Sequence, residues 1–281
     1  MKKIFVLAVF ILLLSSCAKS LPDLAEYKVF SSKEYREIPL TLLVDELSSC
    51  DVILLGEKHD SPFDHYLEYD LLKRISKKRS IVLSLEMFER DVQNILDSYL
   101  AGEITEDSFL AAARPWNNYA SDYRNLLEFA KENKMPVVAS NMPRSLASIV
   151  SKHGGDSLNS ISDVKDFFVR PFMTPDDYKE RFFDFFSSLM PGMEMAGMAK
   201  DNLFSSQLFK DATMAFSINK ALSDNPGSLV FMVCGEFHSD YYQGVYQQLS
   251  AINPNLKIAS ISVPFDSSDF DPSRADYLIL K

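Results

Sequence analysis

Two short stretches of the sequence join an apolar run to the same polar motif. Val52–Leu55 leads into Gly-Glu-Lys-His at 56–59, and Leu229–Cys234 leads into Gly-Glu-Phe-His at 235–238. Each apolar run is typical of a buried strand. Since ligands of open α/β sheets bind beyond the carboxyl ends of the strands, we expect both motifs at that edge of one sheet.

A further carboxylate, Glu86, directly follows the apolar run 80–85 and belongs at the same edge. The candidate site then holds Glu57, His59, Glu86, Glu236 and His238. Such a set can bind a divalent metal, run general acid–base chemistry, or form the polar rim of a pocket. For each residue alone, a helix cap or a local ion pair is the simpler interpretation. The set as a whole favours one shared site.

The motif Asn-Met-Pro-Arg at 141–144 follows another expected strand, 136–140. Asn141 can cap a helix and Pro143 suits an early helical position, so both have a structural explanation. Arg144 does not. It either pairs with carboxylates of the cluster or meets an anionic ligand, and the sequence leaves both open.

The elements that must position these residues alternate along the chain. Expected strands cover 52–55, 80–85, 136–140, 229–234, 258–263 and 277–280, with helical patterns between most of them. This alternation predicts an α/β fold, with a mostly parallel sheet flanked by helices on both faces. We expect a tether and irregular structure over 18–39, and a helix over 240–249.

The segment 156–225 breaks the alternation, because it has no convincing strand and is rich in Phe and Met. We expect a smaller all-helical subdomain there, inserted into an α/β domain made of 17–155 and 226–281. Phe and Met stripes usually form core, but an adaptable apolar surface also suits a flat ligand.

Tyr178 in this segment is a candidate haem ligand, because tyrosine binds ferric iron in some haem proteins. Its neighbours Lys179 and Arg181 could favour the phenolate form and meet haem propionates.

The first residues read as a lipoprotein signal. Met1–Lys3 is charged, Ile4–Leu14 is apolar but too short to span a bilayer, and Leu-Ser-Ser-Cys at 14–17 resembles a lipobox. We expect residues 1–16 to be a signal peptide and Cys17 to carry a lipid anchor such as palmitate. An ordinary cleaved signal is the alternative.

Composition narrows the possible partners. The net charge of −10 argues against nucleic acid, whose phosphates are bound by clustered Lys and Arg. An apolar share of 47% supports a substantial core. Cys50 and Cys234 are expected to be buried thiols, although a disulfide between them stays open because sequence does not fix its geometry.

Together these motifs resemble the ChaN-like haem-binding lipoproteins, within the superfamily of Tiki, TraB and erythromycin esterase proteins. The resemblance rests on the paired Gly-Glu-x-His motifs, Glu86, the Asn-x-Pro-Arg turn and the run 207–215. It implies an α/β domain with a smaller helical domain, and a role in haem or iron acquisition at a bacterial envelope. It also implies that the equivalents of Glu57, His59, Glu86 and His238 are catalytic or metal-linked in hydrolytic relatives.

Two functional hypotheses follow. The first is a haem-binding protein, lipid-anchored to the outer membrane, that forms a homodimer over the haem and works with a haem uptake receptor. Tyr178, His59 or His238 would ligate the iron, and Lys179 or Arg181 would meet the propionates. The second is a hydrolase, an esterase or peptidase. It would use His59 or His238 as base, Glu57 or Glu86 to orient that base or hold a divalent metal, and Arg144 to stabilise negative charge. An envelope adaptor without a ligand ranks last.

Overall fold

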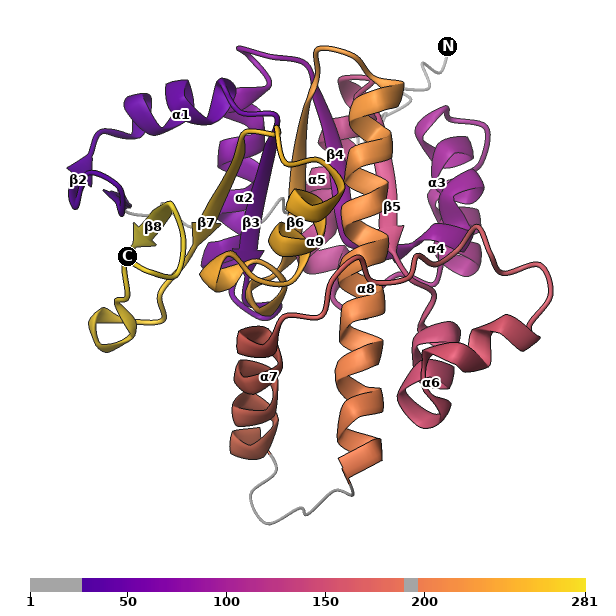
Figure 1. Ribbon diagram of the computed structural model, residues 1–281. Helices are drawn as coiled ribbons and strands as arrows, with labels where there is room; N and C mark the ends of the chain where they lie inside the picture. Colours follow the sequence, from indigo (N-terminus) through magenta and orange to yellow (C-terminus); the bar gives the residue numbers. More distant parts are fainter. Residues whose placement is uncertain (1–26, 190–196) are drawn as a thin grey trace, which may run out of the picture.

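The computed structural model describes residues 27–189 and 197–281. Its centre is an eight-stranded sheet in the order β2-β1-β8-β7-β3-β6-β4-β5 (Figure 1). From β8 to β5 the strands run parallel, while β1 pairs antiparallel with β2 and β8. The strands are Lys28–Ser31 (β1), Arg36–Ile38 (β2), Val52–Glu57 (β3), Ile81–Glu89 (β4), Val137–Asn141 (β5), Leu229–Gly235 (β6), Ile258–Ser262 (β7) and Tyr277–Leu280 (β8). The predicted fold class is confirmed.

Helices cover both faces of the sheet, as Figure 1 shows. The α-helices are Leu40–Ser48 (α1), Pro62–Ile75 (α2), Gln93–Leu100 (α3), Glu106–Ala113 (α4), Arg124–Glu132 (α5), Arg144–His153 (α6), Asp176–Leu189 (α7), Gly197–Asp224 (α8) and Val245–Ile252 (α9). Shorter helical turns are Arg90–Val92 (η1), Tyr119–Tyr123 (η2), Gly155–Ser160 (η3), Glu236–His238 (η4), Asp240–Tyr242 (η5) and Ser267–Asp269 (η6).

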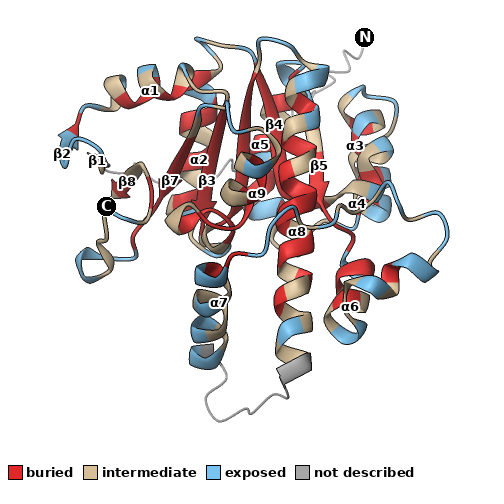
Figure 2. Cartoon of the chain, viewed as in Figure 1, coloured by how far each residue is buried: buried red, intermediate tan, exposed pale blue. Residues whose placement is uncertain are grey.

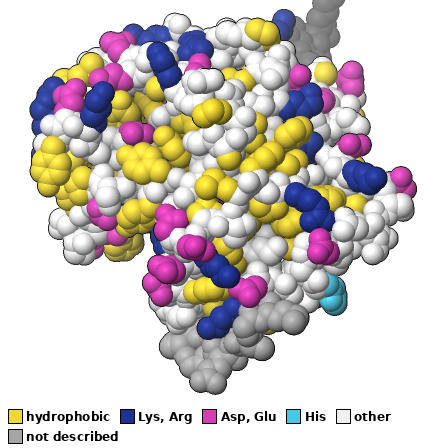
Figure 3. Space-filling model, viewed as in Figure 1, with side chains coloured by type: hydrophobic (Ala, Val, Ile, Leu, Met, Phe, Trp, Pro, Cys, Tyr) yellow, Lys and Arg dark blue, Asp and Glu magenta, His cyan; other side chains and the backbone are white. Residues whose placement is uncertain are grey.

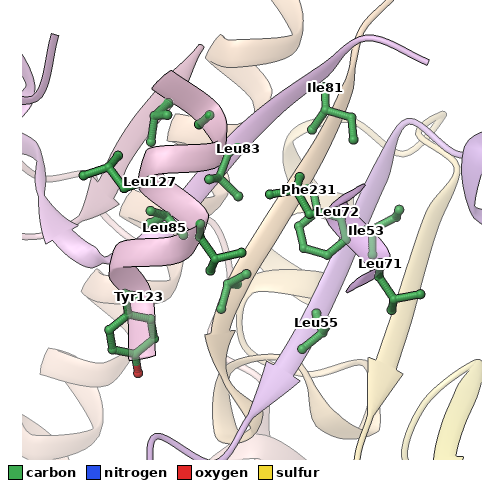
Figure 4. Close-up of a cluster of buried hydrophobic side chains, with 14 of the residues drawn as sticks. Ile53, Leu55, Leu71, Leu72, Ile81, Leu83, Leu85, Tyr123, Leu127 and Phe231 are labelled. Carbon is green, nitrogen blue, oxygen red and sulfur yellow. The ribbon is translucent and has the colours of Figure 1, made fainter. Parts of the chain in front are cut away.

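The inner strands β3 and β6 are buried along their whole length and mostly apolar because both of their faces are covered, as is usual for parallel sheets (Figure 2). Successive side chains of a strand point to opposite faces. In β3, Ile53 and Leu55 pack with α2 and α5 in one cluster (Figure 4). Val52 and Leu54 pack with α8 and α9 in a second cluster on the other face.

The prediction of irregular structure over 18–39 is wrong for 28–38, which form β1 and β2. These strands are only four and three residues long and lie at the edge of the sheet. So short a run shows too little alternation to be recognised, and β1 is held by β8 from the far end of the chain. The helix expected over 240–249 is also broken, because the backbone at Tyr241 and Tyr242 enters the left-handed region, at φ 62° and 59°.

The segment 156–225 contains η3, α7 and α8, and no strand among its described residues. Met214 and Ile218 of α8 pack directly on the sheet. Whether the segment is a separate subdomain stays a prediction.

Several other expectations concern the ends of the chain and its thiols. The signal peptide, Cys17 and part of the Met-rich run (Met190, Met193 and Met195) lie outside the described residues. Within the described part, no helix combines the length and apolar character needed to cross a membrane. Cys50 and Cys234 are free thiols, the first half-buried and the second buried.

Candidate ligand-binding site at the sheet edge

The two Gly-Glu-x-His motifs meet because β3 and β6 are adjacent parallel strands. Glu57 at the end of β3 lies opposite Gly235 at the end of β6. On the other side of β6 lies β4, and the backbone N–H of Gly235 donates to Glu86 Oε2 at 2.8 Å. The expected meeting of these carboxylates and imidazoles at one edge is therefore present in the structure.

The imidazole ring of His59 packs against the backbone of Gly235, and its side chain is 46% exposed. A Cβ at Gly235 would come within 2.8 Å of His59 Cε1, so only glycine leaves room for the ring. His59 Nδ1 donates to Glu57 Oε1 at 2.8 Å. The ring of Trp116 packs edge-on against the imidazole, with 4.8 Å between the ring centroids. Burial alone would lower the pKa of His59, but the bond to Glu57 and the charge of Glu86 raise it.

Glu57 is a buried hydrogen-bonding centre. Its Oε1 accepts from Tyr123 at 2.7 Å as well as from His59, and its Oε2 lies 3.1 Å from His65 Nδ1. Burial alone would raise the pKa of Glu57, but the hydrogen bond from His59 and the nearby imidazole of His65 hold it well below its usual range. Glu57 is therefore a carboxylate that fixes the orientation of His59.

His238 is buried between two carboxylates. Its Nδ1 donates to Asp211 Oδ1 of α8 at 2.5 Å, and its Nε2 lies 3.3 Å from Glu86 Oε1. Burial alone would lower the pKa of His238, but Glu86 and Asp211 raise it to about 10. Burial favours the protonated form of Glu86, but the charge and hydrogen bond of His238 outweigh this and lower its pKa to about 2. At neutral pH an imidazolium thus faces an ionised Glu86.

Tyr178 does not match its expected role as an iron ligand. Its side chain is fully buried, and its hydroxyl donates to Asp211 at 3.0 Å and accepts from Gln207 at 3.1 Å. Burial and the charge of Asp211 hold its pKa well above the usual value of 10. The structure therefore argues against a Tyr178 phenolate on haem iron, because the oxygen is enclosed and kept protonated.

The two cations near Tyr178 point in different directions. Arg181 donates to the backbone oxygen of Phe237 at 2.8 Å and stacks over its ring at 4.1 Å, beside the pocket. Lys179 faces α8 and pairs with Asp201 at 2.8 Å. Arg181 can therefore reach a ligand at this edge, and Lys179 is engaged elsewhere.

Arg144 lines one hollow together with Glu86, but among the described residues its ion pair is with Glu89 and not with the Glu/His cluster. It is mostly exposed, its nearest carboxylate is Glu89 at 3.9 Å, and it lines a different hollow of about 280 Å³ beside Trp116. Of the two roles left open for Arg144, pairing with the cluster carboxylates is therefore not found among the described residues, and contact with an anionic ligand stays a prediction. Arg144 begins α6, and its partner Glu89 is the last residue of β4.

The large pocket at this edge has a volume of about 1140 Å³ and lies between the two Gly-Glu-x-His loops and α7. Its wall includes Phe182, Phe185 and Phe237. Its cations are Lys58, Arg181 and Arg274, and its acidic groups are Glu57, Asp60, Asp177, Glu180, Asp184, Glu236 and Asp240. Figure 3 shows acidic and basic side chains gathered over α7. The pocket therefore offers apolar surface, cations and a half-exposed imidazole to one ligand.

Sequence reasoning missed the partners that come from helices, namely His65, Glu68, Gln207 and Asp211. A signal existed for two of them. The buried stripe of α2 contains His65 and Glu68 among its apolar residues, and charged groups are rarely buried unless they have partners. Asp211 was noticed only within the run 207–215, without a role.

The fold and site define an α/β ligand-binding protein with its pocket at the carboxyl edge of the sheet. Residues 43–249 match the family described as "Haem-binding uptake, Tiki superfamily, ChaN", so the chain belongs to this family. No curated protein matches the sequence.

Solved structures agree on the fold. ChaN of Campylobacter jejuni, whose structure is titled for cofacial haem binding, superposes with a TM-score of 0.70 at 20% identity, covering 91% of this chain and 97% of that chain. The type III effector HopBA1 superposes with a TM-score of 0.52 at 12% identity, covering 85% of this chain and 90% of that chain. The erythromycin esterase EreC superposes with a TM-score of 0.51 at 9% identity, covering 85% of this chain and 77% of that chain.

Proposed function

We propose that this chain binds ferric haem in the large pocket between the two Gly-Glu-x-His loops and α7, with His59 as an iron ligand. We also propose that it serves haem or iron acquisition at a bacterial envelope. The family supports haem as the ligand. The observation that carries the assignment of His59 is its half-exposed ring at the pocket wall, oriented by a buried carboxylate.

His59 has the arrangement of a metal-ligating histidine. Such residues usually donate one ring N–H to a carboxylate or carbonyl, which fixes the ring and leaves the other nitrogen for the metal. Here Nδ1 is held by Glu57, and no hydrogen bond from the described residues reaches Nε2. His238 offers no such nitrogen, because Asp211 and Glu86 occupy both sides of its ring.

The rest of the pocket suits a large flat ligand that carries a few anionic groups. Its volume of about 1140 Å³ exceeds the roughly 300–1,000 Å³ of ordinary small-molecule sites. Phe182, Phe185 and Phe237 supply surface for a macrocycle. Arg181 and Arg274 lie at the same pocket and are the candidate partners for propionates.

A titration of the purified, haem-free chain with ferric haem tests this proposal. We expect a saturable shift of the Soret band, and an affinity at least about ten-fold weaker in His59→Ala because an iron ligand is lost. Tyr178→Phe should keep the wild-type spectrum. His153→Ala is the matched control, because this histidine lies on the exposed last turn of α6. Unchanged affinity in His59→Ala would remove it as ligand, and no binding by the wild type would end the haem proposal.

Membrane attachment through Cys17 is a further part of the proposal. Its support is the lipobox-like sequence at 14–17. In cells, the wild type should sediment with the membrane fraction and Cys17→Ser should not, as judged by immunoblotting of both fractions. Equal distribution of the two proteins would contradict lipidation.

A homodimer over the haem is supported by Phe185, which lines the pocket although 46% of its surface is exposed. A second copy would cover such a ring together with the edge of a bound haem. The haem titration, followed by sedimentation velocity, would show whether haem doubles the mass. A haem uptake receptor of the outer membrane is the partner expected for this role.

The hydrolase alternative rests on the Glu57–His59 pair, which resembles an oriented general base. His238 is a poor base at neutral pH, because its pKa of about 10 keeps it protonated. The same variant separates the two functions: ester or peptide cleavage by the haem-free wild type that disappears in His59→Ala would favour the hydrolase.

A further inference from the structure

A second group of metal-type ligands lies behind Glu57, inside the domain. Helix α2 is capped by Ser61, whose hydroxyl oxygen accepts from the Asp64 N–H, and its buried stripe contains His65 and Glu68. The pair is spaced i, i+3 and therefore shares one face of the helix. With Glu57, it gives one imidazole and two carboxylates, all buried.

The ligand atoms have the spacing of a metal site. His65 Nδ1 lies 3.1 Å from Glu57 Oε2 and 3.3 Å from Glu68 Oε1. One ligand atom from each of the three residues lies within 4.8 Å of the other two. An ion with bonds of about 2.1 Å places its ligand atoms about 3.0 Å apart in octahedral and about 3.4 Å apart in tetrahedral geometry. The two measured separations fall in this interval.

The same two oxygens lack hydrogen-bond partners. Glu57 Oε2 and Glu68 Oε1 are buried and unsatisfied among the described residues, on side chains that are 1% and 0% exposed. An unpaired buried acceptor carries the full penalty of its lost hydration. Because these are the atoms that converge on His65 Nδ1, a cation between them would satisfy both.

The surrounding contacts suit a ligand set that is already oriented. His65 Nε2 lies 3.2 Å from the backbone oxygen of His59, which leaves Nδ1 as the nitrogen facing the carboxylates. Glu57 Oε1 is held by Tyr123 and His59, so its Oε2 is directed inward. Outer partners of this kind are typical of metal sites in proteins.

We propose that Glu57, His65 and Glu68 bind one divalent transition-metal ion, independently of haem. Mixed nitrogen and carboxylate ligation suits Zn²⁺, Mn²⁺ or Fe²⁺ better than Mg²⁺ or Ca²⁺, which prefer oxygen alone. Two carboxylates and a neutral imidazole balance the charge of such an ion. Because all three side chains are buried, the ion enters during folding or through a local opening.

The test measures zinc on the full chain, free of haem. After unfolding, refolding with Zn²⁺ and dialysis, the wild type should retain about one zinc per chain by elemental analysis. Glu68→Gln removes one ligand with little change of shape and should retain less than a tenth of that amount. His153→Ala removes a surface imidazole and should retain as much as the wild type.

Zinc-free wild type, or full zinc in a folded Glu68→Gln protein, would overturn the site. X-ray absorption of the zinc-loaded wild type decides the matter without any variant. We expect a first shell of nitrogen and oxygen at about 2.0–2.1 Å with scattering from a single imidazole. A sulfur ligand or two imidazoles would place the ion elsewhere and contradict the proposal.

Discussion

Replacing Asp211 with Ala is expected to lower the free energy of unfolding by about 3–5 kcal/mol. The reason is that the buried, charged His238 loses one of its two carboxylate partners. The Asp211 carboxylate accepts from His238 at 2.5 Å and from the hydroxyl of Tyr178 at 3.0 Å. All three side chains are buried. Without the carboxylate, His238 keeps only Glu86 as a charged partner, and the Tyr178 hydroxyl loses its acceptor.

Urea denaturation followed by circular dichroism measures this loss. Asp201→Ala is the matched control, because Asp201 lies on the same helix but is 59% exposed and pairs with Lys179. A surface pair of this kind contributes about 0–1 kcal/mol. A loss below 1 kcal/mol for Asp211→Ala would show that the buried group is not coupled as the structure indicates.

Raising the pH from 6.5 to 10 is expected to remove up to roughly 5 kcal/mol of stability through His238 alone. Its pKa is about 10 in the folded protein and 6.5 in its ordinary state. A group whose pKa rises on folding stabilises fully below its unfolded pKa, and this contribution falls as pH approaches the folded value. The charged groups that cause the rise are Glu86 and Asp211.

The comparison is between wild type and His238→Gln, each denatured with urea at pH 6.5 and at pH 10. The wild type should lose more stability over this interval by a few kcal/mol. The pKa of His65 is also raised, to about 11, because the hydrogen bonds and charges of Glu57 and Glu68 outweigh the effect of burial. His65 is present in both proteins, so its contribution to the loss of stability cancels when the two losses are subtracted. Equal losses in the two proteins would contradict the ion pair.

The sheet could be predicted because its inner strands are buried on both faces. Such strands appear in the sequence as continuous apolar runs, as in Val52–Leu55 and Leu229–Cys234. The polar residues after them could then be assigned to one edge. The sequence did not show that β6 lies between β3 and β4, and this order is what brings Glu57, Gly235 and Glu86 into contact.

The helical contributions could not be assigned in the same way. Tyr178, Lys179 and Arg181 are close in sequence, but a helix turns about 100° per residue. Tyr178 and Arg181, three residues apart, share one face, and Lys179 lies on another. Tyr178 is enclosed against Asp211, Lys179 meets Asp201, and Arg181 meets Phe237. Their roles depend on which neighbour each one faces, and that is a property of packing between distant segments.

The strand order also governs when the pocket can exist during folding. Strands β3 and β4 are made early, yet the position between them stays vacant until Leu229–Gly235 has been synthesised. Neither half of the Gly-Glu-x-His pair has its partner before then. A nascent or truncated chain that ends before Leu229 therefore contains His59 and Glu86 but no assembled pocket, and it exposes both edges of β3 and one edge of β4, which invite aggregation.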